Sequence, residues 1–88
     1  MQKELILEHD MPGIAYLRQY KIGKYQVKEY TDSVNGKITA HFEGPLDIHH
    51  FEGEFAVRFI RDIYEDEFDS LIANLQEAKE VIKVYKEG

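Results

Sequence analysis

The stretch "VKEYTDSVNGKITAHF", residues 27–42, carries the strongest folding signal in the chain. Asn35 and Gly36 separate two runs that are rich in strand-forming residues. Asn and Gly accept the positive φ angles that tight hairpin turns require. The sequence therefore predicts a β-hairpin in this stretch.

The apolar pattern of the hairpin also predicts its register. A loop of residues 33–36 sets Val27 opposite Phe42 and collects the apolar side chains on one face. A two-residue loop would set Glu29 opposite Phe42, and a slip of one residue turns every side chain to the other face. We therefore expect the four-residue loop. The inward-facing residues of its second strand are then Ile38, Ala40 and Phe42.

The residues before the hairpin loop predict two further strands and the first strand of the hairpin itself. Residues 3–9 alternate Leu with Glu, and residues 14–20 and 24–30 are rich in Tyr and Val, which strands favour. The Gly-containing segments 10–13 and 21–23 are expected to turn the chain between these strands.

After the hairpin, residues 46–53 predict a short irregular strand or an extended loop, and residues 54–64 predict a longer strand. Apolar residues fall on both faces of this longer strand, with Phe55, Val57 and Phe59 on one face and Ala56 and Ile60 on the other. Such two-sided apolar character is typical of a central strand. We therefore expect residues 54–64 inside the sheet rather than at its edge.

The apolar period changes to that of a helix from Asp66 onward. One apolar stripe joins Phe68, Leu71, Ile72, Leu75, Ala78, Ile82 and Tyr85. Asp66 is the expected N-cap, and Lys83 and Lys86 lie in the last turn, where cations interact favourably with the helix dipole. The sequence predicts a helix of about residues 66–86.

These elements indicate a single α+β domain spanning residues 1–88. We expect an antiparallel β-meander of about five strands within residues 3–63, packed on one face by a single C-terminal helix. The second face of the sheet would be partly open. The residues expected to line that open face are Tyr16, Tyr20, Tyr25, Tyr30 and Ile60.

The net charge of −6 is unevenly distributed along the chain. Residues 1–37 contain six basic and five acidic residues, whereas residues 38–88 contain five basic and twelve acidic residues. A negative field of this kind repels a nucleic-acid backbone and favours a basic partner surface.

The composition excludes several classes of protein. The chain has no cysteine, so it has no disulfide scaffold, thiolate metal site or thiol nucleophile. Nothing in the first residues resembles a signal peptide, and no apolar run in the sequence is long enough to span a bilayer. We therefore expect a cytoplasmic protein without membrane contact.

A four-residue repeat, "HFEG", occurs at residues 41–44 and again at 50–53. We interpret it as two strand ends, each with a buried Phe, an exposed Glu and a Gly for the turn, because the odd spacing of nine puts the copies on opposite faces of a continuous strand. A metal site is the alternative hypothesis, against which stands the break at Gly44-Pro45, because nothing in the sequence fixes the mutual geometry of the residues on its two sides. Its ligands would be His41, Asp47 and His49, because His and carboxylate ligands are those that zinc prefers.

Enzymatic activity is not expected, and no cofactor is implied. The chain has no Gly-rich nucleotide loop, and neither Ser33 nor Ser70 has an arranged His–acid pair. The His41–Glu43 and His50–Glu52 spacings are typical of solvated neighbours on a strand.

Residues 15–30 suggest a nucleic-acid interface as an alternative function. Tyr side chains alternate there with Arg18, Lys21, Lys24 and Lys28. Aromatic and basic residues on one sheet face can stack bases and hold phosphates, as single-strand binders do. The acidic balance of the whole chain makes nucleic acid the less favoured partner.

The favoured hypothesis is a non-enzymatic protein-binding module that engages a basic protein surface. Small acidic chains without cysteine are frequent among phage and mobile-element inhibitors, some of which mimic the charge of DNA, and this likeness is one of size and charge only. A homodimer formed through an edge strand is a further partner hypothesis. The expected binding residues are Tyr16, Tyr20, Tyr25, Tyr30, Glu43, Glu65, Asp66, Glu67 and Asp69.

Overall fold

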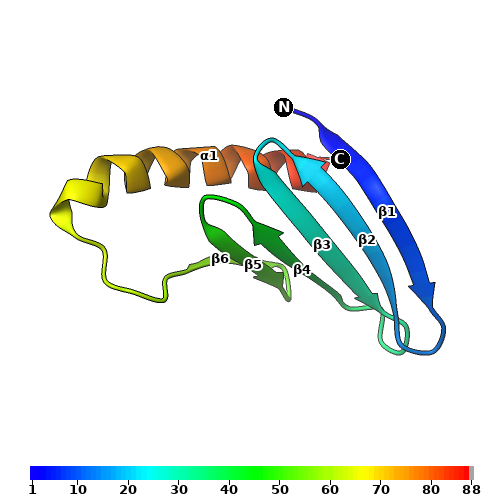
Figure 1. Cartoon of the computed structure of the whole chain (residues 1–88). Helices are drawn as coiled ribbons and strands as arrows, with labels where there is room; N and C mark the ends of the chain where they lie inside the picture. Colours follow the sequence, from blue (N-terminus) through cyan, green and yellow to red (C-terminus); the bar gives the residue numbers. More distant parts are fainter. Residues whose placement is uncertain (88) are drawn as a thin grey trace.

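The computed structural model describes residues 1–87 as one antiparallel sheet followed by a helix (Figure 1). The six strands follow one another in the sheet in chain order, and they are β1 (Lys3–Met11), β2 (Ala15–Ile22), β3 (Tyr25–Asp32), β4 (Ile38–Glu43), β5 (Asp47–Phe51) and β6 (Glu54–Arg58). The 3₁₀ turn η1 (Glu65–Glu67) leads into the helix α1 (Phe68–Glu87). The α+β class and the meander are confirmed. The sheet has six strands rather than about five, because β5 is a regular strand.

The β3–β4 hairpin has the predicted four-residue loop. Val27 pairs with Phe42, and the Asp32 amide donates to the carbonyl of Lys37 at 2.8 Å. Asp32 also stabilises the loop, because its carboxylate accepts a hydrogen bond of 2.7 Å from the Val34 amide. Gly36 adopts a φ of 71°, which explains why the turn contains the Asn-Gly pair.

The core lies between α1 and one face of the sheet, here called the helix-facing side. The buried residues are Tyr20, Ile22, Tyr25, Val27, Ala40, Phe42, Leu46 and Ile48 from the strands and turns, and Ala78, Val81 and Tyr85 from α1. Ala40 and Phe42 point inward as predicted, whereas Ile38, at the start of β4, is exposed. No helix within residues 1–87 combines the length and apolar character needed to cross a membrane.

Gly44 ends the first copy of the repeat for a packing reason. A Cβ atom at Gly44 would lie 2.5 Å from Cδ1 of the buried Tyr25 ring. The Tyr25 hydroxyl in turn accepts a hydrogen bond of 3.3 Å from the Leu46 amide. The β4–β5 turn is therefore held closely against the core.

A polar network fastens the C-terminal end of α1 to the sheet. The Tyr85 hydroxyl donates a hydrogen bond to the buried carboxylate of Glu29 in β3. The Lys3 ammonium lies 3.1 Å from the Tyr85 carbonyl and 4.4 Å from the centre of the Tyr20 ring. Burial is the main cause that lowers the pKa of Lys3, and the nearby Glu29 carboxylate opposes it.

The N-terminal half of α1 extends beyond the sheet (Figure 1). The buried helix residues all lie at position 78 or later, whereas Phe68, Ile72 and Leu75 are exposed. The sequence predicted that the whole apolar stripe of the helix packs on the sheet. This prediction is therefore wrong for the first half of the stripe. A helix of 20 residues is about 30 Å long, and the sheet covers only part of that length.

The start of the helix also differs from the prediction. Asp66 lies within η1 and is not the N-cap, and α1 begins at Phe68. The amide of Tyr64 donates to the Glu67 carboxylate at 3.1 Å, and the amide of Glu67 donates to the Tyr64 carbonyl at 2.9 Å. These two reciprocal bonds satisfy backbone groups that a helix start leaves without partners.

β6 is an edge strand, so the prediction of a central strand for residues 54–64 is wrong. Within residues 1–87, β6 pairs only with β5, and it ends at Arg58. Phe59 and Ile60 lie outside the sheet and are exposed, because the chain leaves β6 there to reach the start of α1.

β1, the opposite edge strand, contains a bulge. Leu5 pairs with Tyr20 and Leu7 pairs with Gln19, which leaves Ile6 as the extra residue between them. Leu5 and Leu7 therefore point to opposite faces of the sheet, although strict alternation would put them on the same face.

Candidate functional site

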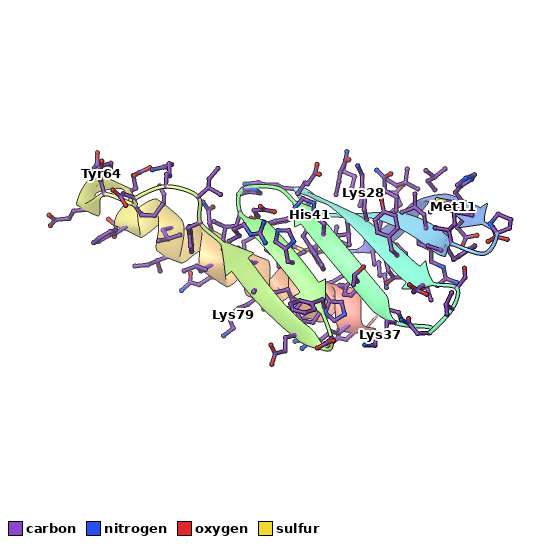
Figure 2. The ribbon with its side chains drawn as sticks, turned by 90° about the horizontal axis from the view of Figure 1, so that it is seen from below. Met11, Lys28, Lys37, His41, Tyr64 and Lys79 are labelled. Carbon is purple, nitrogen blue, oxygen red and sulfur yellow. The ribbon has the colours of Figure 1, made fainter. Side chains whose placement is uncertain are left out.

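The first candidate site is a group of three side chains on the open face of the sheet, here called the His–Asp cluster: His41, Asp47 and His49. His41 and His49 are directly paired across β4 and β5. Figure 2 shows His41 on the face turned away from α1, near Lys28 of β3. All three cluster side chains are partly exposed.

Both imidazoles are aimed at a single carboxylate oxygen. His41 Nε2 hydrogen-bonds to Asp47 Oδ1, and His49 Nε2 lies 3.3 Å from the same oxygen. The two rings are stacked, with centroids 4.6 Å apart and an angle of 21° between their planes. The ligand-type atoms of the three residues all lie within 4.8 Å of one another.

The polar atoms of the cluster differ in the hydrogen bonds and charged neighbours that they have. His49 Nε2 is buried and has no hydrogen-bond partner among residues 1–87. His41 is flanked on its other ring nitrogen, because Glu43 Oε1 lies 3.5 Å from Nδ1. The hydrogen bond from His41 is the main cause that lowers the pKa of Asp47, and the neighbouring His49 contributes in the same direction.

The structure brings together the three residues that the metal hypothesis named. The sequence argument against them was that nothing fixes their geometry after the break at Gly44-Pro45. That argument was wrong, because the β4–β5 hairpin pairs His41 with His49 directly. Two imidazoles and a carboxylate can share protons or hold a metal cation.

The second "HFEG" copy does not join the cluster. His50 lies on the helix-facing side, where it stacks on Phe55 with centroids 4.1 Å apart and donates a hydrogen bond of 3.1 Å to the Glu54 carbonyl. Glu52 and Gly53 have positive φ angles of 51° and 81° and form the β5–β6 turn. The repeat thus marks two strand ends, as predicted, but the Phe of the second copy, Phe51, is exposed rather than buried.

The second candidate site is the part of the molecule beyond the sheet, here called the overhang: the loop of residues 59–64, η1, and α1 up to residue 75. Figure 2 shows Tyr64 at its far end. Its exposed large apolar residues are Phe59, Ile60, Tyr64, Phe68, Ile72 and Leu75. Such a concentration is uncommon on a small monomer and typical of an interaction surface.

Acidic residues surround these apolar side chains. Within residues 1–87, Asp62, Glu65, Asp66 and Asp69 are exposed and have no ion-pair partner, so the overhang keeps a negative surplus. Glu67 differs from them, because Arg61 binds its carboxylate through two hydrogen bonds of 2.6 and 3.0 Å.

The Arg61–Glu67 pair holds the start of the helix in place. The hydrogen bonds from Arg61, followed by that from the Tyr64 amide, lower the pKa of Glu67 to about 2. The Arg61 side chain is 61% exposed and that of Glu67 is 35% exposed, so solvent screening limits the contribution of the pair to stability.

A cleft of about 260 Å³ lies between the loop, the helix start and the β4–β5 turn. Its apolar wall consists of Pro45, Leu46, Phe59, Ile60, Ile63 and Leu71. Its polar wall consists of Asp47, Arg58, Arg61, Glu67, Ser70 and Asn74. This volume is below the range of typical pockets for drug-sized ligands, about 300–1,000 Å³.

The Tyr-bearing binding face expected from the sequence does not form. Tyr20 and Tyr25 are 8% and 0% exposed and lie in the core on the helix-facing side. Tyr16 is partly buried beneath the Arg18 guanidinium, which lies 5.2 Å from the ring centre. Tyr30 alone of these four is exposed on the open face. Strand alternation places Tyr16 and Tyr20 on the face opposite Tyr30.

The remaining predicted binding residues are divided between two places. Glu65, Asp66, Glu67 and Asp69 lie in the overhang, whereas Glu43 lies beside His41 in β4. Sequence reasoning missed Phe59, Phe68 and Ile72 as surface residues, because their periodicity is that of core residues. The dense acids among them were the only sequence signal of exposure.

In comparisons with known proteins, no family model, no curated protein and no solved structure matches this chain.

Proposed function

We propose that this chain is a non-enzymatic protein-binding module whose overhang engages a basic protein surface. The observation that carries the proposal is the combination of exposed apolar side chains and unpaired acids at one end of the molecule. The apolar residues supply contact area, and the acidic residues favour a partner surface of positive charge.

The apolar part of this surface suits a protein partner. Aromatic residues are enriched in the centres of protein interfaces, and Phe59, Tyr64 and Phe68 are exposed together with Ile60 and Ile72. Burying such area contributes roughly 25 cal/mol per Å² before the cost of association. The adjoining cleft has room for an apolar side chain of the partner rather than for a large metabolite.

The charge of the overhang argues for a basic partner and against a second copy of the chain. Two overhangs in contact would bring the unpaired Asp62, Glu65, Asp66 and Asp69 of each copy together, which costs free energy. A surface rich in Lys and Arg would instead be attracted over a distance of about 10 Å at moderate salt. A DNA-binding protein has such a surface, so inhibition by charge mimicry of DNA is the more specific form of this proposal.

Nucleic-acid binding has less support as the function. Base stacking by the segment of residues 15–30 would need exposed aromatic rings, and Tyr20 and Tyr25 are core residues. A cytoplasmic location belongs to the proposal and rests on the sequence alone.

Site-specific photo-crosslinking in a lysate of the source organism tests the proposal. A photoreactive residue is placed at position 60 and, as a control, at position 34 in the β3–β4 loop. Ile60 and Val34 are 91% and 86% exposed, so the two positions are equally accessible. We expect adducts with a basic protein from position 60 only, and DNA should compete with a DNA-binding partner. Equal adducts from both positions, or adducts with acidic proteins, would contradict the proposal.

A further inference from the structure

We propose that His41, Asp47 and His49 form a binding site for one divalent transition-metal ion of the Zn²⁺ type. Two imidazole nitrogens and one carboxylate oxygen are a common ligand set for such ions. The site lies on the open face of the sheet, so this inference does not depend on the function proposed for the overhang.

The distances in the cluster fit a shared ion. Zn²⁺ lies about 2.0–2.2 Å from nitrogen and oxygen ligands, so two ligands in a tetrahedral site are about 3.3–3.5 Å apart. His49 Nε2 and Asp47 Oδ1 are 3.3 Å apart, which matches this separation. His41 Nε2 is closer to the same oxygen, through a hydrogen bond. The ion would take the place of that proton, with a small outward rotation of the His41 ring.

The backbone that carries the ligands is already ordered. His41 and His49 are cross-strand partners, and Asp47 begins the same strand as His49, opposite Glu43. Residues i and i+2 of a strand share a face, so neighbouring strands present all three side chains in one direction. A site built on strands holds its ligands more firmly than a site built on loops.

Glu43 is placed to support the ligand His41 by a hydrogen bond, without binding the ion itself. Its Oε1 lies 3.5 Å from His41 Nδ1, the ring nitrogen that does not face Asp47. A proton on Nδ1 directed at Glu43 leaves the lone pair of Nε2 free for the ion. Carboxylate partners of this kind orient metal-binding histidines and raise their basicity.

The Nε2 atom of His49 points to the same conclusion. Buried polar atoms without a hydrogen bond are uncommon in folded proteins, and His49 Nε2 is one within residues 1–87, although it lies 3.3 Å from Asp47 Oδ1. A bound ion at the cluster would satisfy it. Lys28 and Arg58 lie opposite His41 and Asp47 on the neighbouring strands and oppose cation binding, whereas the carboxylates of Asp47 and Glu43 favour it.

Three protein ligands leave at least one coordination position open. The side chains of His41, Asp47 and His49 are 36%, 43% and 33% exposed, so water reaches the remaining position. This arrangement resembles an open metal site more than a closed structural one, in which four protein ligands surround the ion.

The test uses the full chain without a histidine tag and Zn²⁺ as the probe, with calorimetry and thermal unfolding as readouts. We expect saturable binding of one Zn²⁺ per chain and a rise in Tm that saturates with it. Co²⁺ should give the visible absorption of imidazole coordination. In NMR spectra, the imidazole resonances of His41 and His49 should shift, while those of His9 and His50 should not.

Variants separate a metal site from non-specific binding. His41→Ala, His49→Ala and Asp47→Asn should each weaken Zn²⁺ binding by at least about a hundredfold, because removal of an outer partner alone typically costs 10- to 100-fold. Glu43→Gln should weaken it about tenfold. His9→Ala is the matched control, because His9 is exposed on β1 far from the cluster in the strand order, and it should bind like the original chain.

The cluster side chains lie outside the core, so the variants are expected to fold, and circular dichroism checks this. Absence of saturable binding by the folded chain would overturn the proposal. Undiminished binding by folded His41→Ala or His49→Ala would also overturn it. Ile72→Asp lies in the overhang but outside the cleft that Asp47 lines, so it should leave Zn²⁺ binding unchanged. A failure of the protein-binding proposal can therefore be recognised independently of the metal result.

Discussion

Tyr85, near the end of α1, donates its hydroxyl hydrogen to the carboxylate of Glu29 in the middle of β3. The two residues are 56 positions apart in the sequence and are both buried. Burial is the main cause that raises the pKa of Tyr85, and the Glu29 carboxylate adds to it. The helix is therefore joined to the sheet by a specific polar contact as well as by apolar packing.

Removing the hydroxyl should leave a buried carboxylate without its donor. We expect Tyr85→Phe to lower the free energy of unfolding by about 2–3 kcal/mol, because a hydrogen bond to a charged group is lost and the group stays buried. Urea denaturation measures the change, and Tyr30→Phe on the exposed face is the control. Combining Tyr85→Phe with Glu29→Gln should cost less than the sum of the single changes. Strict additivity would show that the two side chains do not interact.

Two leucine truncations should separate the core from the overhang. Leu46 is 8% exposed against the core, whereas Leu75 is 37% exposed on α1. Leu46→Ala should cost about 2–4 kcal/mol, as truncation of a buried Leu usually does, and Leu75→Ala should cost about 1 kcal/mol or less. Chemical denaturation of both variants gives the comparison. Equal costs would mean that the first half of α1 is covered.

The Arg61–Glu67 pair should contribute to stability in a defined pH range. The pKa of Glu67 is lowered from 4.5 to about 2 in the folded chain, so its contribution is present above pH 4.5 and is lost as the pH falls toward 2. The difference in Tm between the original chain and Glu67→Gln should therefore shrink over that range. Glu80→Gln, an exposed helix position, is the control. A difference in Tm that is independent of pH would exclude the ion pair as its cause.

Charge reversal in the overhang should act on the rate of association. We expect Glu65→Lys with Asp66→Lys to slow association with the crosslinked partner and to flatten its salt dependence, because exposed charges mainly steer the encounter. Ile60→Ser should instead raise the dissociation rate, because apolar anchors act mainly there. Surface plasmon resonance at several salt concentrations measures both. Glu67 is unsuitable for this test, because it holds the helix start through Arg61.

The sequence predicted the fold where local rules decide it. The register of the β3–β4 hairpin followed from the pairing of Val27 with Phe42, and the helix followed from its apolar period. Both signals are local, and tertiary packing reinforced them.

The errors share a physical cause. The apolar character of Phe59, Phe68 and Ile72 predicted burial, but burial needs a partner surface, and the sheet ends before it reaches them. The placement of Tyr20 and Tyr25 depended on which strand face the helix covers, which strand alternation alone does not decide. The His–Asp cluster was predictable as a set of residues, whereas its convergence required the pairing of β4 with β5.

The bulge in β1 has a consequence for the solubility of the chain. A flat apolar edge strand is a template for pairing with other chains, and the run Leu5-Ile6-Leu7 would provide one. The extra residue at Ile6 twists this edge and interrupts its ladder of free backbone groups. Deleting Ile6 would restore regular alternation and flatten the edge, which exposes the chain to fibril-like stacking. We therefore expect this one extra residue to hinder self-association of the chain through β1.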